Sequence, residues 1–228
     1  MHRASGSCGL TQYWLYDGTF TPESYYGVEI TADVTSAGFD LNDGQLLTLT
    51  PDGLTIVGRT PAGVLQSVTR SARSPTAFDF APPTAAWFAT INFVGVIRDV
   101  AISNDSLFLF FVVQGSPSEL WQAVRSGPAE AFGSPQKLAG TATDQVNDGT
   151  FEAVTGAGAG GHTVYITKNF ATYVFTRDQT TDPLALQNGA SPFAVWYAHP
   201  IFGCERLLGT MSPGGCAGEG IGTLVYSW

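Results

Sequence analysis

The segment at residues 103–125 begins with Ser103-Asn-Asp-Ser-Leu-Phe-Leu-Phe110 and ends with Glu119-Leu-Trp-Gln-Ala-Val-Arg125. Its first four residues are of the types that form tight turns, because short polar side chains bond to the nearby backbone. The apolar and aromatic residues that follow favour strands bounded by turns. The segment therefore predicts a turn and two strands, of which the second ends in an arginine.

This unit recurs along the chain. Similar apolar strands are predicted at 54–57, 163–166 and 223–226, after turns at 50–53, 155–158 and 212–215. The second strand and its arginine recur at 65–70 and 173–177. The turns begin about every 52 to 57 residues, so four periods account for the chain. Arg70, Arg125 and Arg177 occupy equivalent places, and we expect them to close onto neighbouring turns in a structural role.

The fourth copy of the second strand is found at the start of the chain, at 12–16, rather than after 226. The last repeat must therefore combine inner strands from the C-terminus with outer strands from the N-terminus. A ring of four-stranded sheets closed in this way is a β-propeller. The sequence predicts an all-β fold, a four-bladed β-propeller that forms a single domain over 1–228. The innermost strands are expected at 46–49, 99–102, 151–154 and 207–211.

The repeat also resembles that of a known family. Its turn, its strand with Leu120-Trp121 and Arg125, and the following Phe132-Gly-Ser-Pro135 look like the TolB-like (WD40-like) β-propeller repeat. The turn at 50–53 matches as well, whereas the copies at 155 and 212 lack the aspartate. The resemblance implies the propeller fold and implies little about function, because one fold serves many roles.

Composition excludes some partners. Ten Lys and Arg against nineteen Asp and Glu give a net charge of -9. Since phosphate contacts supply most nucleic-acid affinity, we expect no nucleic-acid partner. The sequence shows no apolar run of about 18 residues, so we expect no membrane insertion.

Six charged residues come just before or at the predicted innermost strands and should surround the channel mouth: Asp43, Arg98, Asp99, Asp148, Glu205 and Arg206. Asp43 and Asp148 fall in matching Asn-Asp-Gly sequences and would face each other across the ring. Two close carboxylates raise one another's pKa or recruit a cation, so a calcium or other cation in the central channel is one expectation. Good turn chemistry is the other explanation of these sequences.

Aromatic residues mark the connections before two of the repeats. Trp87 and the group Trp196, Tyr197 and His199 lie in segments that match each other. Rigid aromatic side chains could form an exposed stacking platform for a ligand. They could equally pack between blades.

Catalytic motifs of the common hydrolases and nucleotide-binding enzymes are absent from the sequence. Glycoside hydrolysis would need two carboxylates at a fixed separation, and Asp43, Asp99, Asp148, Glu152 and Glu205 are candidates whose distances the sequence does not set. The glycine-rich run at 156–161 precedes no helix that could bind an anion, so we interpret it as a loosened turn.

Three cysteines are present: Cys8, Cys204 and Cys216. They indicate an exported protein with one disulfide, secreted, periplasmic or on the cell surface. Cys8 and Cys204 precede strands at the same end of the closing blade, whereas Cys216 lies at the other end. Bridged Cα atoms lie within about 7 Å, so we expect Cys8–Cys204, with Cys204–Cys216 as the alternative.

Taken as a whole, the sequence predicts a secreted or cell-envelope β-propeller binding module that recognises a glycan, peptide or protein ligand at the channel mouth. One alternative is a glycan-directed hydrolase that uses the mouth carboxylates. Another is a structural scaffold with a cation in its central channel.

Overall fold

The computed structural model describes residues 2–6, 10–16, 27–29, 31–40, 47–71, 80–115, 118–138, 151–168, 171–187, 196–201, 206–210 and 226–227. Within these ranges the chain is built almost entirely of antiparallel strands. The helical elements there are α1 (Thr31–Ser36) and two short 3₁₀ turns, η2 (Ala86–Phe88) and η3 (Ala159–Gly161). The prediction of an all-β fold is confirmed.

The described strands form five sheets, which follow the chain in order. The first holds β1 (His2–Gly6), β2 (Leu10–Tyr16) and β3 (Gly27–Glu29), and the second β4 (Thr48–Leu49), β5 (Thr55–Arg59) and β6 (Leu65–Thr69). The third holds β7 (Ile97–Ile102), β8 (Phe108–Val113), β9 (Glu119–Val124) and β10 (Gln136–Lys137). The fourth holds β11 (Phe151–Ala157), β12 (Thr163–Lys168), β13 (Ala171–Thr176) and β14 (Ala185–Leu186). The fifth holds β15 (Trp196–Ile201), β16 (Arg206–Thr210) and β17 (Tyr226–Ser227).

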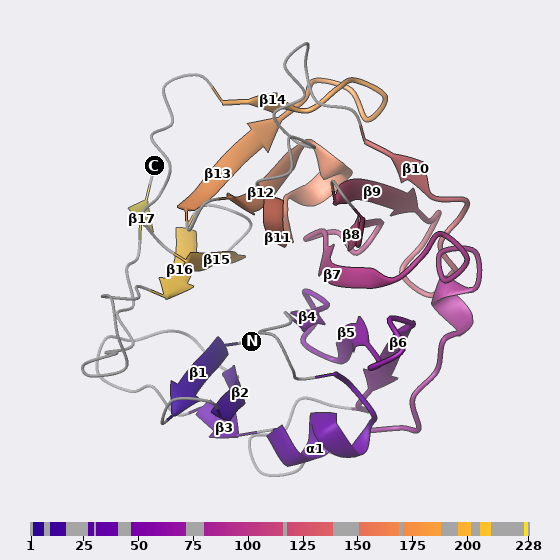
Figure 1. Cartoon of the computed structure of the whole chain (residues 1–228), viewed down its shortest axis with the longest axis vertical. Coiled ribbons are helices and arrows are strands. Elements are labelled where there is room, and N and C mark those ends of the chain that lie inside the picture. The colour runs from indigo at the N-terminus through magenta and orange to yellow at the C-terminus, as the bar shows by residue number, and fades with distance from the viewer. Residues whose placement is uncertain are drawn as a thin grey trace.

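The sheets are arranged around a common centre in chain order, with β4, β7 and β11 towards the centre and β6, β10 and β14 towards the outside (Figure 1). Strand β7 contacts β4 and β5 of the sheet before it and β11 of the sheet after it, and β11 also contacts β15. Sheets that succeed one another around a centre with their first strands innermost have the arrangement of a β-propeller.

The number of sheets and the strand pairing of the two chain ends differ from the sequence prediction. The described strands make five sheets where four blades were expected. The N-terminal hairpin does not share a sheet with the described C-terminal strands, because β3 pairs with β2, for example Val28 with Leu15. At the other end, β15 precedes β16, so the strand expected to be innermost at 207–211 is the central strand of its sheet.

Other sequence-predicted elements are confirmed. The expected innermost strands at 46–49, 99–102 and 151–154 overlap β4, β7 and β11. The turns at 50–53 and 103–106 close as predicted, with Gly53 N–H donating to Thr50 O at 2.8 Å and Ser106 N–H to Ser103 O at 2.8 Å. The turn predicted at 155–158 is wrong, because β11 continues through two register shifts to Ala157 and the chain turns only after Gly158.

The core lies between the sheets, and β8 shows how it is organised. All six residues of β8 are buried. Phe108, Phe110 and Val112 pack towards the fourth sheet, and the alternate residues Leu109, Phe111 and Val113 pack towards the second. Successive side chains of a strand point to opposite faces, so a continuous apolar run suits a sheet that is covered on both faces.

Hydrogen bonds also join the innermost strands directly. Ile102 N–H donates to Thr48 Oγ1 at 3.2 Å, and Asn104 N–H donates to Ala157 O at 3.2 Å. Strands β4, β7 and β11 are therefore linked in sequence around the centre.

Close packing between elements predicts a difference between two glycines. A Cβ atom at Gly58 in β5 would overlap Leu47 and lie 2.9 Å from Phe39 Cδ1, whereas one at Gly127 would meet only Glu130 Cγ at 3.8 Å. We expect Gly58→Ala to lower the free energy of unfolding by about 1–3 kcal/mol, as overpacking does. Gly127→Ala should leave it unchanged or slightly raised. Denaturant titration measures both, and equal stabilities would contradict the packing described for β5.

Candidate functional site

The ring has two ends, which we name by the strands that meet there. Strands β4, β7 and β11 begin at the leading face. The turns at 50–53, 103–106 and 158–162 lie at the opposite end, the turn face. Of the expected mouth residues, Arg98 and Asp99 are fully described. Arg206, Trp196, Tyr197 and His199 are described as strand residues of β15 and β16. Asp43, Asp148, Glu205 and the cysteines Cys8, Cys204 and Cys216 lie outside the described residues.

Asp99 links two innermost strands. Its side chain is 5% exposed, and its two oxygens accept backbone hydrogen bonds from Val100 N–H (2.9 Å) and Val154 N–H (3.1 Å). A register shift in β7 between Ile97 and Asp99 accompanies this contact with β11. These bonds compensate for the burial of the carboxylate, since a buried charge without such partners is strongly unfavourable. Asp99 therefore has a structural role in joining β7 to β11.

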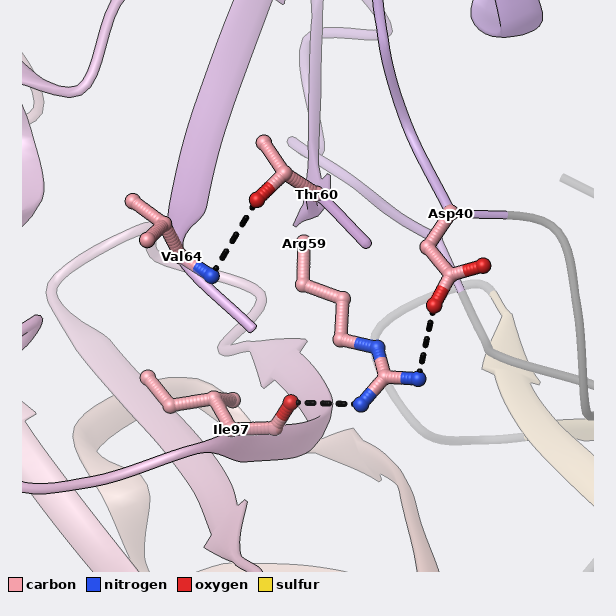
Figure 2. Close-up of polar contacts among 5 residues, drawn as sticks. All are labelled: Asp40, Arg59, Thr60, Val64 and Ile97. Atoms are coloured by element: carbon pink, nitrogen blue, oxygen red, sulfur yellow. Dashed lines mark hydrogen bonds and ion pairs between the residues drawn. The ribbon is translucent and has the colours of Figure 1, made fainter. Parts of the chain in front are cut away.

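A buried ion pair ties the second sheet to the start of the third. Arg59 Nη2 lies 2.8 Å from Asp40 Oδ2, and Arg59 Nη1 donates to Ile97 O at 2.9 Å (Figure 2). Val64 N–H donates to Thr60 Oγ1 in the turn that follows β5. The charge of Arg59 is thus matched by Asp40 inside the protein.

Arg98 differs from these neighbours. It follows Ile97 directly, it is exposed, and its side chain makes no hydrogen bond or ion pair within the part of the chain that the structure describes. Within the described residues it is accordingly an exposed cation at the leading face.

Three apolar residues are also exposed, two on the loop that leads into β7 and one in the turn between β5 and β6. Phe93 is 90% exposed, Val96 47% and Val64 36%. Val64 and Val96 are brought together because Ile97 N–H donates to Gly63 O at 3.3 Å, and a Cβ at Gly63 would lie 2.7 Å from Val96 Cγ1. We call Val64, Phe93, Val96 and Arg98 the leading-face patch.

The loop that carries Phe93 is anchored both to the second sheet and to the third. The Asn92 side chain makes two hydrogen bonds to the backbone of Leu65 at the start of β6. Its Oδ1 accepts from Leu65 N–H at 2.8 Å, and its Nδ2 donates to Leu65 O at 3.2 Å. Thr90 Oγ1 donates to Phe132 O at 2.9 Å. Ile91 is fully buried between the second and third sheets. The Phe93 ring therefore projects from a fixed backbone, and no pattern in the sequence marks it as exposed.

Trp87 packs at the other end of the molecule. The Arg125 guanidinium carbon lies 4.5 Å from the centre of its ring, the Phe88 ring meets it edge-to-face at 6.3 Å, and its carbonyl accepts from Phe132 N–H. These contacts favour the packing interpretation of Trp87 over an exposed stacking platform.

The turn face is held by three equivalent arginines. Arg70 Nε donates to Gly53 O at 2.9 Å, Arg125 Nε to Ser106 O at 2.6 Å, and Arg177 Nε to Gly161 O at 2.9 Å. All three side chains are buried. Burial lowers the pKa of Arg125 and of Arg177, and the Asp52 and Asp182 carboxylates oppose those shifts. The prediction that these arginines close onto turns in a structural role is confirmed.

The glycine-rich run at 156–161 donates a hydrogen bond to a neighbouring carboxylate. Asp105 Oδ1 accepts from Ser103 Oγ and Leu107 N–H, and Asp105 Oδ2 reaches the fourth sheet to accept from Gly160 N–H. Gly160 and Gly161 have φ of 70° and 65°, which favours glycine at both positions. The Gly160 N–H in this turn therefore binds an anion that is a side chain of the protein itself.

Comparisons with known proteins show distant structural likeness only. No family model and no curated protein matches the sequence. Among solved structures, TolB from Acinetobacter baumannii is similar with a TM-score of 0.42 and 11% identity over 74% of this chain and 38% of that one. Kuenenia stuttgartiensis hydrazine synthase gives 0.41 and 14% over 74% and 42%. A Hadza microbial sialidase gives 0.41 and 13% over 72% and 40%. The chain thus spans less than half of the length of each.

Two features of the described residues bear on the remaining expectations. None of the helices found there is long and apolar enough to cross a membrane. In the same ranges, no three His, Cys, Asp or Glu side chains gather as metal ligands would. The cation expected between Asp43 and Asp148 stays a prediction, because both residues lie outside those ranges.

The Asp105 contacts predict a dependence of stability on pH. Burial raises the pKa of Asp105, but hydrogen bonds from Ser103, Gly160 and Leu107 outweigh it and leave the pKa below its usual value. A lowered pKa contributes stability that is present above the unfolded-state value of about 3.9 and is lost as pH falls through the folded-state value. Asp105→Asn should therefore lower the free energy of unfolding at pH 7 by about 1–2 kcal/mol, with a smaller difference at low pH.

Chemical denaturation between pH 3 and pH 7 measures the free energy of unfolding of both proteins. This range spans the ordinary titration of aspartate, which has a pKa of about 3.9. Asp178→Asn is the matched control, because Asp178 is exposed beside Arg177. A difference between Asp105→Asn and the original protein that does not change with pH would contradict an ionised Asp105 in the folded state.

Proposed function

We propose that this chain is a propeller-like binding module that recognises a polypeptide partner with its leading face. The observation that carries the proposal is Phe93, which is 90% exposed on a loop anchored by Asn92 and Ile91. Burying a phenylalanine side chain is worth about 1.5–3 kcal/mol. A fixed aromatic ring can make this gain without first being ordered, which reduces the entropic cost of binding.

The chemistry of the leading-face patch favours a polypeptide over a glycan. Phenylalanine and arginine are enriched in protein interfaces, and the most important contacts tend to cluster. Val64 and Val96 extend the apolar surface beside Phe93 but supply no side-chain hydrogen bond for sugar hydroxyls. The expected stacking residue Trp87 is engaged by Arg125 at the turn face.

The hydrolase and the cation-bearing scaffold remain separate hypotheses that depend on other residues. At the leading face, Asp40 is paired with Arg59, and Asp99 accepts two backbone hydrogen bonds. Catalysis would therefore rest on Asp43, Asp148, Glu152 and Glu205, and a channel cation on Asp43 and Asp148. Export, which the cysteines indicate, is part of our proposal as the setting in which the module meets its partner.

A displayed library of random peptides, selected on the whole protein, tests this function. We expect selected peptides that bind the original protein and bind Phe93→Ser at least tenfold more weakly, because removing the ring removes about 1.5–3 kcal/mol of apolar burial. Val124→Ser is the matched control, since Val124 is 42% exposed at the end of β9, away from the patch. Peptides that bind Phe93→Ser as well as the original protein, or binding of a glycan array alone, would contradict the proposal.

A further inference from the structure

We propose that the leading-face patch recognises an apolar segment that carries carboxylates, with Phe93 as the apolar contact and Arg98 as the group that binds the acid. This inference rests on the proposed function and specifies its partner. The partner is a peptide segment or protein loop in which Leu, Ile, Val or aromatic residues alternate or cluster with Asp and Glu.

The local charge of the patch carries the argument. The chain as a whole has a net charge of -9. At the leading face, Arg59 is matched by Asp40, Glu119 by Lys137, and Asp99 is buried with its oxygens bonded to backbone N–H groups. Arg98, by contrast, is exposed and has no ion-pair partner among the described residues. Within the described residues the patch therefore carries a positive charge, and interfaces pair opposite potentials.

The backbone places Arg98 and the apolar residues on one surface. Val96, just before β7, and Arg98, its second residue, are both exposed, while Ile97 between them is buried. Positions two apart in an extended chain lie about 7 Å apart. Val96 is fixed there because its carbonyl accepts from Gln114 N–H at 2.8 Å. An extended segment laid over Val96 would therefore bring a carboxylate within reach of the guanidinium.

Arginine suits this role because its planar group binds a carboxylate with two parallel hydrogen bonds. A second copy of this chain is a poorer occupant than a short acidic segment, because it brings a whole net charge of -9 against the same net charge, whereas the segment brings only its own few carboxylates. A lipid surface is a poorer occupant for the same reason, since anionic membranes repel an acidic protein.

The test compares the peptides selected by two baits, the original protein and Arg98→Glu, each after removal of peptides that still bind Phe93→Ser. We expect the pool from the original protein to be enriched in Asp and Glu relative to the input library, and the pool from Arg98→Glu to be enriched in Lys and Arg. Fluorescence polarisation then measures the best labelled peptide of the first pool. We expect Arg98→Gln to weaken its binding about threefold to fivefold at low salt, in the range of an exposed ion pair, with little difference at 1 M salt.

The outcomes separate this inference from the proposed function. A Phe93-dependent pool without enrichment in acidic residues would overturn the acidic partner and leave the binding module standing. Failure to obtain any Phe93-dependent pool would overturn both. Sedimentation velocity adds one further outcome: a dimer that Phe93→Ser dissociates would show that a second copy occupies the patch and would overturn the inference. Thermal unfolding of each variant checks that these exposed substitutions leave the fold intact.

Discussion

Three buried guanidinium groups hold the turns on which this ring depends. In each of the second, third and fourth sheets, an arginine at the end of the third strand donates from Nε to a carbonyl of the turn between the first two strands. Burying a guanidinium group is unfavourable, and the hydrogen bond from Nε to the turn carbonyl offsets part of this effect. This hydrogen bond therefore fixes the turn relative to the strand, and the fixed turn can then contact the following sheet. Asp105 shows this most directly, because its turn is held by Arg125 and its carboxylate reaches Gly160 in the following sheet.

The central repeats could be predicted because their signals are local. Turn residues such as those at 103–106 bond to their own backbone, and an apolar run such as 107–110 needs only a covered sheet to be buried. The arginine positions followed from the same spacing. The turns with an aspartate, at 50–53 and 103–106, were located correctly. The copy at 155–158 lacks that aspartate, and there the strand runs on to Ala157.

The ends of the chain and the binding surface depend on contacts that no repeat encodes. The short strand β3 completes a separate N-terminal sheet, and β15 includes Pro200. Proline, which lacks an N–H, argues against an inner strand of a sheet but is tolerated in an edge strand such as β15. Asp99 reads as a mouth residue in sequence, yet a register shift turns it towards β11. Large aromatic residues are commonly buried, so residue type alone does not mark Phe93 as exposed. Its exposure follows only from the anchoring of Asn92 and Ile91, which leaves the next side chain pointing outward.

The role of the buried arginines in holding the turns is tested by the free energy of unfolding of two arginine variants. Arg125→Lys and Arg98→Lys make the same chemical change and keep the charge, but only Arg125 bonds a turn from a buried position. We expect Arg125→Lys to lower the free energy of unfolding by about 1.5–3 kcal/mol, as the loss of hydrogen bonds from a charged group does. Arg98→Lys should change it by less than about 0.5 kcal/mol. Equal effects of the two substitutions would contradict the account.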